Sequence, residues 1–268
     1  MAWDNTEDIL TDLVILGRAA PEEMRDGRQT VCTGAWSPEK GFIRLYPISP
    51  EDNLFSRWDV VNVEVERNSN DMRHESWKIK GRKRNQREKV EIIGQYPREK
   101  WATLMHNLEN ACVNEINEAK RSLGIISPES INLYYEDWED DDHPSKQSKL
   151  LKERDELKPD NRGEFDKNIK IKYTCPDCTN KQGYHDHPLL AWEAYMGQKN
   201  TSSCDELADN FRFNDENYCH WFFVGNMNQF KRSFMVISVI RVKDPVIYNH
   251  TFEEFPKVAD DFIPANEH

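Results

Sequence analysis

Short apolar runs separated by turn residues dominate the first hundred residues. They lie at residues 12–16, 29–33, 42–46, 60–66, 76–79 and 90–93. In the clearest of them Val61, Val63 and Val65 alternate with polar residues, which predicts a strand with one buried face. Six short strands with turns between them predict a small barrel of the OB or PUA-like kind.

A helical pattern follows these strands. Over residues 98–123 apolar side chains recur every three or four positions, Pro97 precedes the pattern and Gly124 follows it. This arrangement predicts one long central helix. Cys112 falls on the apolar face, where a cysteine is typically a small buried hydrophobic residue.

The second half is again rich in strand-forming residues. We expect strands at 169–173, 221–226 and 234–241, a short helix at 189–196, and a hairpin loop at 226–233. The last two strands are apolar along most of their length, which predicts burial on both faces. The fold class is therefore β-rich α+β.

A charged stretch separates the two halves. An acidic run at 136–142 leads into a highly charged segment that ends near Lys167. We interpret residues 136–167 as an exposed linker or mobile loop, with a metal-binding or nucleic-acid-mimicking arm as the alternative. The expected organisation is an OB-like barrel plus central helix over 1–135, this linker, and a β-domain with a Cys/His loop over 168–268.

Composition adds limits on compartment and partners. The 268 residues carry a formal net charge of −12, which repels nucleic acid at long range, so phosphate binding would need a local patch. Residues 1–10 do not resemble a secretory signal, and no apolar run approaches the ~20 residues that span a bilayer. We expect a cytoplasmic protein without a membrane partner. The six cysteines are then thiols or metal ligands rather than disulfides.

One segment gathers soft metal ligands. Cys175 and Cys178 stand at the spacing of a zinc-binding turn, and His185 and His187 follow closely. These four residues predict a zinc site, with Cys204 and Cys219 as alternate ligands. All-protein ligation would make the zinc structural. The alternative interpretation is a thiol pair with surface histidines.

A basic loop joins two of the barrel strands. A phosphate backbone is the natural partner of such a cluster, and Trp58 and Trp77 could stack on bases. The alternative is a solvated loop that offsets the acidic surface. The basic residues of the loop are Lys78, Lys80, Arg82, Lys83, Arg84, Arg87 and Lys89.

A compact charged cluster follows the fourth expected strand. It consists of Asp71, Arg73, His74 and Glu75. On an extended segment Asp71, Arg73 and Glu75 share a face, where they could perform acid/base chemistry on a sugar or phosphate. The interpretation we favour is an ion pair of Arg73 that fixes the loop.

Two further polar residues interrupt apolar strands. Arg44 would need a carboxylate partner inside a barrel, for which Asp71 or Glu75 is suited, or a bound anion. We expect Arg44 to contact nucleic acid if the protein binds one. Asn226 is either a turn residue, which we favour, or an amide presented to a ligand.

Several short motifs resemble those of prokaryotic proteins with dual OB-like domains. The resemblance implies β-barrel modules and a prokaryotic or mobile-element context, but no reaction and no catalytic residues. The motifs cover much of the chain and lie at Thr30–Ala35, Gly41–Ile48, Asp71–Ser76, Ser122–Ile126, Trp192–Glu193 and Phe222–Asn226.

These observations lead to three functional hypotheses. The first is a protein that binds DNA or RNA through the basic loop and its aromatics. The second is an enzyme, nuclease- or glycosidase-like, that acts on nucleic acid or a nucleotide through the charged cluster. The third is a non-catalytic subunit with a protein partner. The chain lacks the P-loop, dinucleotide-binding, zincin and nucleophile-elbow motifs, which disfavours the corresponding enzyme classes.

Overall fold

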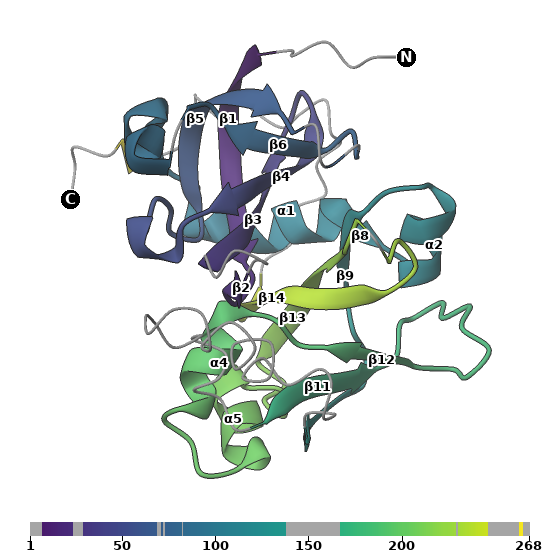
Figure 1. Ribbon diagram of the computed structural model, residues 1–268. Coiled ribbons are helices and arrows are strands. Elements are labelled where there is room, and N and C mark those ends of the chain that lie inside the picture. The colour runs from purple at the N-terminus through teal and green to yellow at the C-terminus, as the bar shows by residue number, and fades with distance from the viewer. Residues whose placement is uncertain are drawn as a thin grey trace, which may run out of the picture.

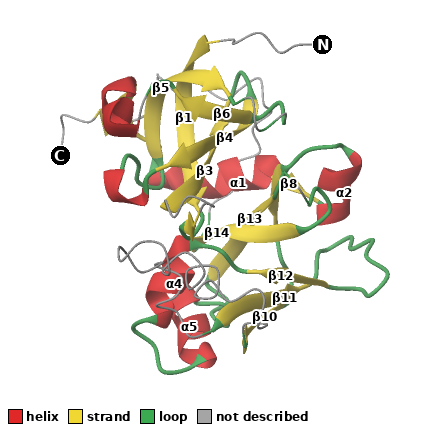
Figure 2. Cartoon of the chain, in the orientation of Figure 1, coloured by secondary structure: helices red, strands yellow, loops and turns green. Residues whose placement is uncertain are grey.

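The computed structural model describes residues 7–23, 29–68, 71, 73–81, 83–137, 167–228, 230–245 and 263–264. Within these residues the chain is β-rich, with a barrel at the N-terminal end and two further sheets beyond it (Figures 1 and 2). Most of the linker expected at 136–167 lies outside the described residues.

Five strands close into a barrel, because β1 pairs with both β3 and β5. The β4–β6 pair is parallel. The barrel strands, in spatial order, are β1 (Glu7–Arg18), β3 (Gln29–Ser37), β4 (Gly41–Ile48), β6 (Ser76–Ile79) and β5 (Asp59–Arg67). Strand β2 (Glu22–Glu23) extends β3, whereas β7 (Val90–Gln95) and β15 (Ile263–Pro264) extend β5. Three 3-10 helices lie at Pro50–Asp52 (η1), Lys83–Lys89 (η2) and Arg98–Lys100 (η3).

Alternation along the strands fills the barrel. Val61, Val63 and Val65 are fully buried and pack in the barrel core with Ile43 and Leu45 of β4. The period-two pattern predicted for β5 is therefore confirmed. Because successive side chains of a strand point to opposite faces, Phe42, Arg44 and Tyr46 lie on the outer face of β4, whereas Ile48, beyond a shift in the β3–β4 register, returns to the barrel core.

The single helix predicted over 98–123 is wrong. The structure has α1 (Trp101–Leu108), the short strand β8 (Glu109–Asn110) and α2 (Val113–Glu118). Glu109 and Asn110 pair with β9 (Leu123–Ile126), so their backbone groups bond to a sheet. Apolar residues keep helical spacing in both α1 and α2, so the sequence pattern resembles that of one continuous helix.

The remaining strands form two sheets. The four-stranded sheet has the order β14-β13-β9-β8 and the three-stranded sheet the order β10-β11-β12. Strands β9 and β10 thus pair with strands beyond residue 168, although the sequence groups them with the barrel. The bounds are β10 (Ile131–Glu136), β11 (Asn168–Tyr173), β12 (His185–Pro188), α4 (Trp192–Gln198), α5 (Cys204–Phe211), β13 (Tyr218–Asn226) and β14 (Phe234–Lys243).

The barrel and the four-stranded sheet share a core. The rings of Phe42 on β4 and Phe223 on β13 stack at 5.8 Å. A Cβ atom at Gly34 would lie 1.9 Å from the Phe223 ring, so only glycine permits this approach. Residues 221–226 and 234–240 are all buried, as predicted for strands covered on both faces. Among the described residues, no helix has the length and apolar character needed to cross a bilayer.

Candidate metal centre and cleft

Four soft ligands converge between the three-stranded sheet and α2. The ligand atoms of Cys112, Cys175, Cys178 and His185 all lie within 4.8 Å of one another. The His185 Nε2 atom is 3.2 Å from the Cys112 Sγ atom and 3.4 Å from the Cys178 Sγ atom. Zinc bound at its usual distances would separate such ligands by about 3.6 Å in a tetrahedron. The group therefore has the composition and spacing of a four-ligand metal site.

Three separate segments supply these ligands. Cys175 and Cys178 lie on the turn that follows β11, and His185 begins β12 opposite Tyr173. Cys112 is the N-cap residue of α2, with φ −158° and ψ 158°. This extended conformation turns the thiol away from the helix path and toward the group.

Burial shifts the pKa of two of these ligands. It lowers the pKa of His185, so its imidazole is neutral and can coordinate a metal. Burial, followed by the neighbouring Cys112 and Cys178 thiols, raises the pKa of Cys175 well above its ordinary value. Thiols packed this closely repel one another as thiolates, and a cation among them removes that cost.

The structure brings together three of the four predicted ligands. His187 is not in the group, because its Nδ1 atom is hydrogen-bonded to the Tyr173 hydroxyl at 3.1 Å. Burial lowers its pKa to about 4. Cys204 begins α5 and Cys219 lies on β13, and neither joins the group. Cys112 takes the fourth position. It is 2% exposed and packs in the apolar core, as predicted, and its Sγ atom also faces the group.

Three lysines of the basic loop are matched by carboxylates. Ion pairs join the Nζ atoms of its lysines to acidic residues of β1 and β5. They are Lys78–Glu66 at 2.7 Å, Lys80–Glu7 at 2.6 Å and Lys89–Glu64 at 3.0 Å. Arg87 is exposed, whereas Arg82 and the side chains of Lys83 and Arg84 lie outside what the structure describes.

Neither predicted stacking tryptophan is available to a base. Trp58 is 5% exposed and stacks on Trp101 at 4.4 Å. Trp77 is 4% exposed, and the Arg67 guanidinium covers its ring at 3.6 Å. Both rings belong to the packed interior, because barrel closure and α1 bury them. The prediction that they form a nucleic-acid-stacking surface is wrong.

The Asp71–Arg73 ion pair forms as the favoured interpretation predicted. Arg73 donates from Nε and Nη2 to the two Asp71 carboxylate oxygens, at 2.8 and 2.6 Å. Its Nη1 atom donates to the backbone carbonyl of Asn226 at 2.6 Å. Burial opposes the Asp71 charge, but the Arg73 hydrogen bonds outweigh it and lower the pKa of Asp71. The pair thus links the barrel to the end of β13.

Glu75 and His74 turn away from this pair. One Glu75 oxygen accepts from the Ser122 backbone N–H at 2.8 Å, and the other lies 3.1 Å from the His74 Nδ1 atom. Burial opposes the Glu75 charge, but hydrogen bonds, first from Ser122, lower its pKa. The four-residue cluster is therefore divided into two structural arrangements.

Arg44 is buried on the outer face of β4, under the four-stranded sheet, rather than inside the barrel. It is 5% exposed. Its Nη1 atom donates to the Cys32 Sγ atom at 3.2 Å, and its Nη2 atom to the Ser122 carbonyl and hydroxyl at 3.1 Å. Its Nε atom has no hydrogen-bond partner. No described carboxylate forms an ion pair with Arg44. The Glu75 carboxylate accepts from the Ser122 N–H, whereas the Glu75 backbone carbonyl accepts from the Arg44 backbone N–H at 2.8 Å.

Arg44 lines a cavity of about 330 Å³ between the barrel and the four-stranded sheet, which we name the cleft. The sequence singled out Arg44, Asp71, Arg73 and Asn226, and the structure brings these four together here. It did not indicate the rest of the lining, although Tyr46 shares a strand face with Arg44. The other lining residues are Ala19, Ala20, Thr30, Cys32, Tyr46, Asn68, Leu190, Gly225, Met227, Asn228, Met235 and Ile237.

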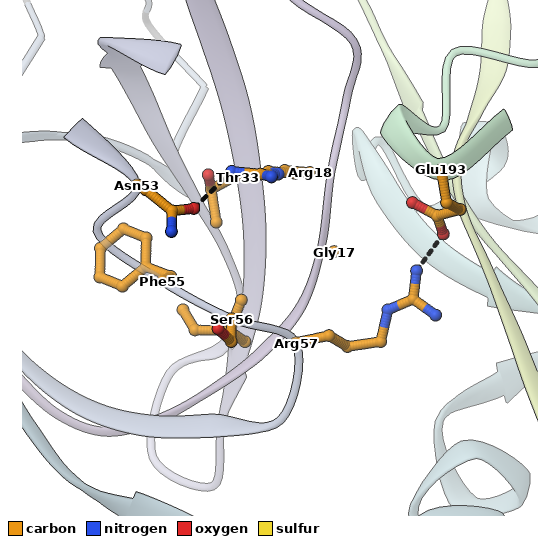
Figure 3. Close-up of a pocket in the computed structure, with 9 residues that line it drawn as sticks. Gly17, Arg18, Thr33, Asn53, Phe55, Ser56, Arg57 and Glu193 are labelled. Atoms are coloured by element: carbon orange, nitrogen blue, oxygen red, sulfur yellow. Dashed lines mark hydrogen bonds and ion pairs between the residues drawn. The ribbon is translucent and has the colours of Figure 1, made fainter. Parts of the chain in front are cut away.

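A second cavity of about 240 Å³ lies between the barrel and α4. Arg57 reaches across it toward Glu193, and the two side chains form an ion pair (Figure 3). Arg57 also donates to the Val239 carbonyl at 2.9 Å and to the Ser238 hydroxyl at 2.7 Å. Its cation is already matched, which distinguishes this cavity from the cleft.

Comparisons with known proteins match two families. A domain of unknown function, DUF8758, matches residues 10–107, and another, DUF8757, matches residues 102–257. No curated protein matches. One similar solved structure, described as "Molecular basis for abrogation of activation of pro-inflammatory cytokines", is 8% identical with a TM-score of 0.33 over 90% of this chain and 97% of that chain. That TM-score is too low to show a shared fold.

Proposed function

The chain belongs to the domain family of unknown function DUF8757, and we propose that it binds a phosphate-bearing ligand, a nucleotide or nucleic acid, in the cleft. The observation that carries this proposal is Arg44. The Arg44 guanidinium is 5% exposed and lines the cleft, and no carboxylate in the described part of the chain forms an ion pair with it. A buried charge requires an opposite charge or full hydrogen bonding, and a bound anion supplies both.

The remaining lining suits the rest of a nucleotide. Leu190, Met235 and Ile237 provide apolar surface, whereas Tyr46 and Asn228 add polar side chains. A cavity of about 330 Å³ is comparable to small-ligand sites, which begin at about 300 Å³. The closed five-stranded barrel forms one side of the cleft, and the cleft lies outside that barrel.

The proposal moves nucleic-acid binding away from the basic loop. Lys78, Lys80 and Lys89 already have carboxylate partners, so a phosphate would have to displace those partners. Arg44 has none among the described residues. The cleft is thus the better candidate even though the loop carries more positive charge.

Binding is favoured over acid/base catalysis by the charged cluster. A general acid at neutral pH needs a raised pKa, whereas the pKa values of Asp71 and Glu75 are both lowered. Asp71 is also held by Arg73 through both oxygens. The cluster therefore positions Arg73 and Ser122 around the cleft.

We further propose that the metal centre is a structural zinc site. Three thiols and one imidazole are a zinc-binding set, and four protein ligands leave no open position for catalysis. Bound zinc would join α2 to the β11–β12 hairpin, adding to the hydrogen bond between the Asn114 side-chain amide and the Thr179 hydroxyl at 2.9 Å. Its contribution would be to folding.

The cleft proposal is tested with nucleoside 5′-monophosphates and inorganic phosphate as probes. We expect each nucleotide to raise the melting temperature at constant ionic strength. Arg44→Gln should abolish this shift, because charged hydrogen bonds to the phosphate are lost. Arg57→Gln is the matched control, since Arg57 is an arginine at the second cavity. An equal shift in wild type and Arg44→Gln would overturn the proposal.

A further inference from the structure

The hairpin between β13 and β14 carries an exposed aromatic and two exposed cations beside the cleft. Phe230 is 56% exposed and Met227 39% exposed, and Lys231 and Arg232 are also exposed. Met227 and Asn228 line the cleft itself. We name Met227, Phe230, Lys231 and Arg232 the hairpin surface.

Hydrogen bonds fix this surface relative to the cleft. The Asn226 side-chain amide donates to the Lys231 carbonyl at 2.7 Å, while Asn226 accepts from Arg73 through its backbone and side-chain oxygens. Backbone turns join Phe230 N–H to the Met227 carbonyl at 3.2 Å and Ser233 N–H to the Phe230 carbonyl at 3.0 Å. Asn226 thus connects a cleft cation directly to the hairpin.

The cations of the hairpin surface differ from those of the basic loop. Within the described part of the chain, neither Lys231 nor Arg232 forms an ion pair, whereas Lys78, Lys80 and Lys89 all do. An unmatched pair of cations in a protein of net charge −12 concentrates positive potential at one place. Met227 and Asn228 of the same hairpin line the cleft, so this potential lies on an element that borders it.

We infer that the cleft and the hairpin surface together bind a single-stranded nucleic acid, an inference that rests on the proposed function of the cleft. One nucleotide occupies the cleft with its phosphate at Arg44. A neighbouring base stacks on Phe230, and the adjoining phosphates contact Lys231 and Arg232. Stacking on an exposed aromatic and electrostatic contact with the backbone are how proteins hold single strands.

A single strand fits this surface better than a duplex. Stacking on Phe230 requires a base whose face is free, and bases in a duplex are already stacked. The cleft, at about 330 Å³, has room for one nucleotide rather than a base pair. Exposed Phe230 and Met227 could also contact a protein partner. Lys231 and Arg232, on the hairpin that borders the cleft with its Arg44 cation, favour a polyanion such as a nucleic acid instead.

The test measures fluorescence anisotropy of labelled single-stranded DNA, single-stranded RNA and duplex DNA with the full chain. We expect single strands to bind more tightly than duplex, and the DNA and RNA arms identify the natural strand. Phe230→Ala should weaken strand binding about tenfold or more. The control is Ile92→Ala, since Ile92 is an exposed apolar residue of β7, and it should have no effect.

Removing the two hairpin cations should change the salt dependence. Log K falls as log salt rises. In the double variant Lys231→Gln/Arg232→Gln this negative slope should become shallower by about 0.7 for each lost phosphate contact. The control Lys78→Gln/Lys80→Gln removes two cations that are already paired, so it should leave the slope nearly unchanged.

The outcomes separate this inference from the proposed function. If mononucleotides bind through Arg44 while the hairpin variants leave strand binding unchanged, the inference is overturned and the proposed function stands. If strand binding depends on Phe230 but Arg44→Gln has no effect on any ligand, the proposed function fails. Absence of any oligonucleotide binding overturns the inference.

Discussion

Arg73 donates to both the backbone and the side-chain oxygen of Asn226. A residue of the loop between β5 and β6 is thereby tied to the end of β13. Asp71 orients this arginine, and the side chains of the pair are 7% and 11% exposed. The charged cluster therefore acts as a joint between the barrel and the four-stranded sheet. It also fixes one wall of the cleft.

The first prediction concerns Asp71→Asn. The substitution leaves the nearly buried Arg73 without its counter-charge, so we expect the free energy of unfolding at neutral pH to fall by about 3 kcal/mol. Urea denaturation measures this loss. Glu51→Gln is the control, since Glu51 is an exposed carboxylate. If Asp71→Asn lowers the free energy of unfolding no more than Glu51→Gln does, the Asp71–Arg73 pair does not stabilise the contact between the barrel and the four-stranded sheet.

Acid should remove the advantage of the native aspartate. The pKa of Asp71 is lowered in the folded state, so its contribution is present above the unfolded value of about 3.9 and is lost as the pH falls through the lower folded value. The stability difference between wild type and Asp71→Asn should thus shrink as the pH drops below about 4. A difference that stays constant into acid would show that the charge has no part in it.

Periodicity predicted much of the fold because burial on one face leaves a direct trace in the sequence. The alternation of Val61, Val63 and Val65 marks the barrel wall, and the unbroken apolar runs mark β13 and β14. Backbone pairing leaves no such trace. Glu109 and Asn110 form a strand only because β9 lies beside them. The apolar spacing continues across these two residues, so the sequence pattern predicts a single helix there.

The candidate sites show the same limit. The Cys175–Cys178 spacing is local and predicts a metal site, whereas Cys112 is distant in sequence and joins the group only through the fold. The sequence indicates that Arg44 needs a partner, but Asp71 binds Arg73 instead. That choice depends on tertiary contacts. It leaves Arg44 with hydrogen bonds to Cys32 and Ser122 but without an ion pair to any carboxylate that the structure describes, which is the property that the proposed function uses.

The second prediction concerns the contact between Gly34 and Phe223. Gly34→Ala places a Cβ atom 1.9 Å from the Phe223 ring, so the ring must move within a packed core. We expect a destabilisation of about 1–3 kcal/mol by thermal or urea unfolding. Phe223→Leu in the same chain should restore part of the loss. Additive effects of the two substitutions would show that the two residues do not limit each other.

The third prediction separates the contributions of Arg57. Its ion pair with Glu193 joins side chains that are 28% and 32% exposed, so solvent screening should limit the coupling in a double-mutant cycle to about 1 kcal/mol. Arg57→Ala should cost more than Glu193→Gln, because it also removes the bonds to Val239 and Ser238. A larger loss from Glu193→Gln than from Arg57→Ala would reverse this assignment.

The fourth prediction concerns the metal centre. Protein purified without chelators should contain about one equivalent of zinc by elemental analysis, as expected for one four-ligand site. Cys112→Ser should lose the metal and unfold at a lower temperature, because metal binding contributes to folding. Cys219→Ser is the matched control, since Cys219 lies outside the group, and it should retain both zinc and stability. Wild-type protein with less than about half an equivalent, or Cys112→Ser with full zinc, would exclude the proposed ligand set.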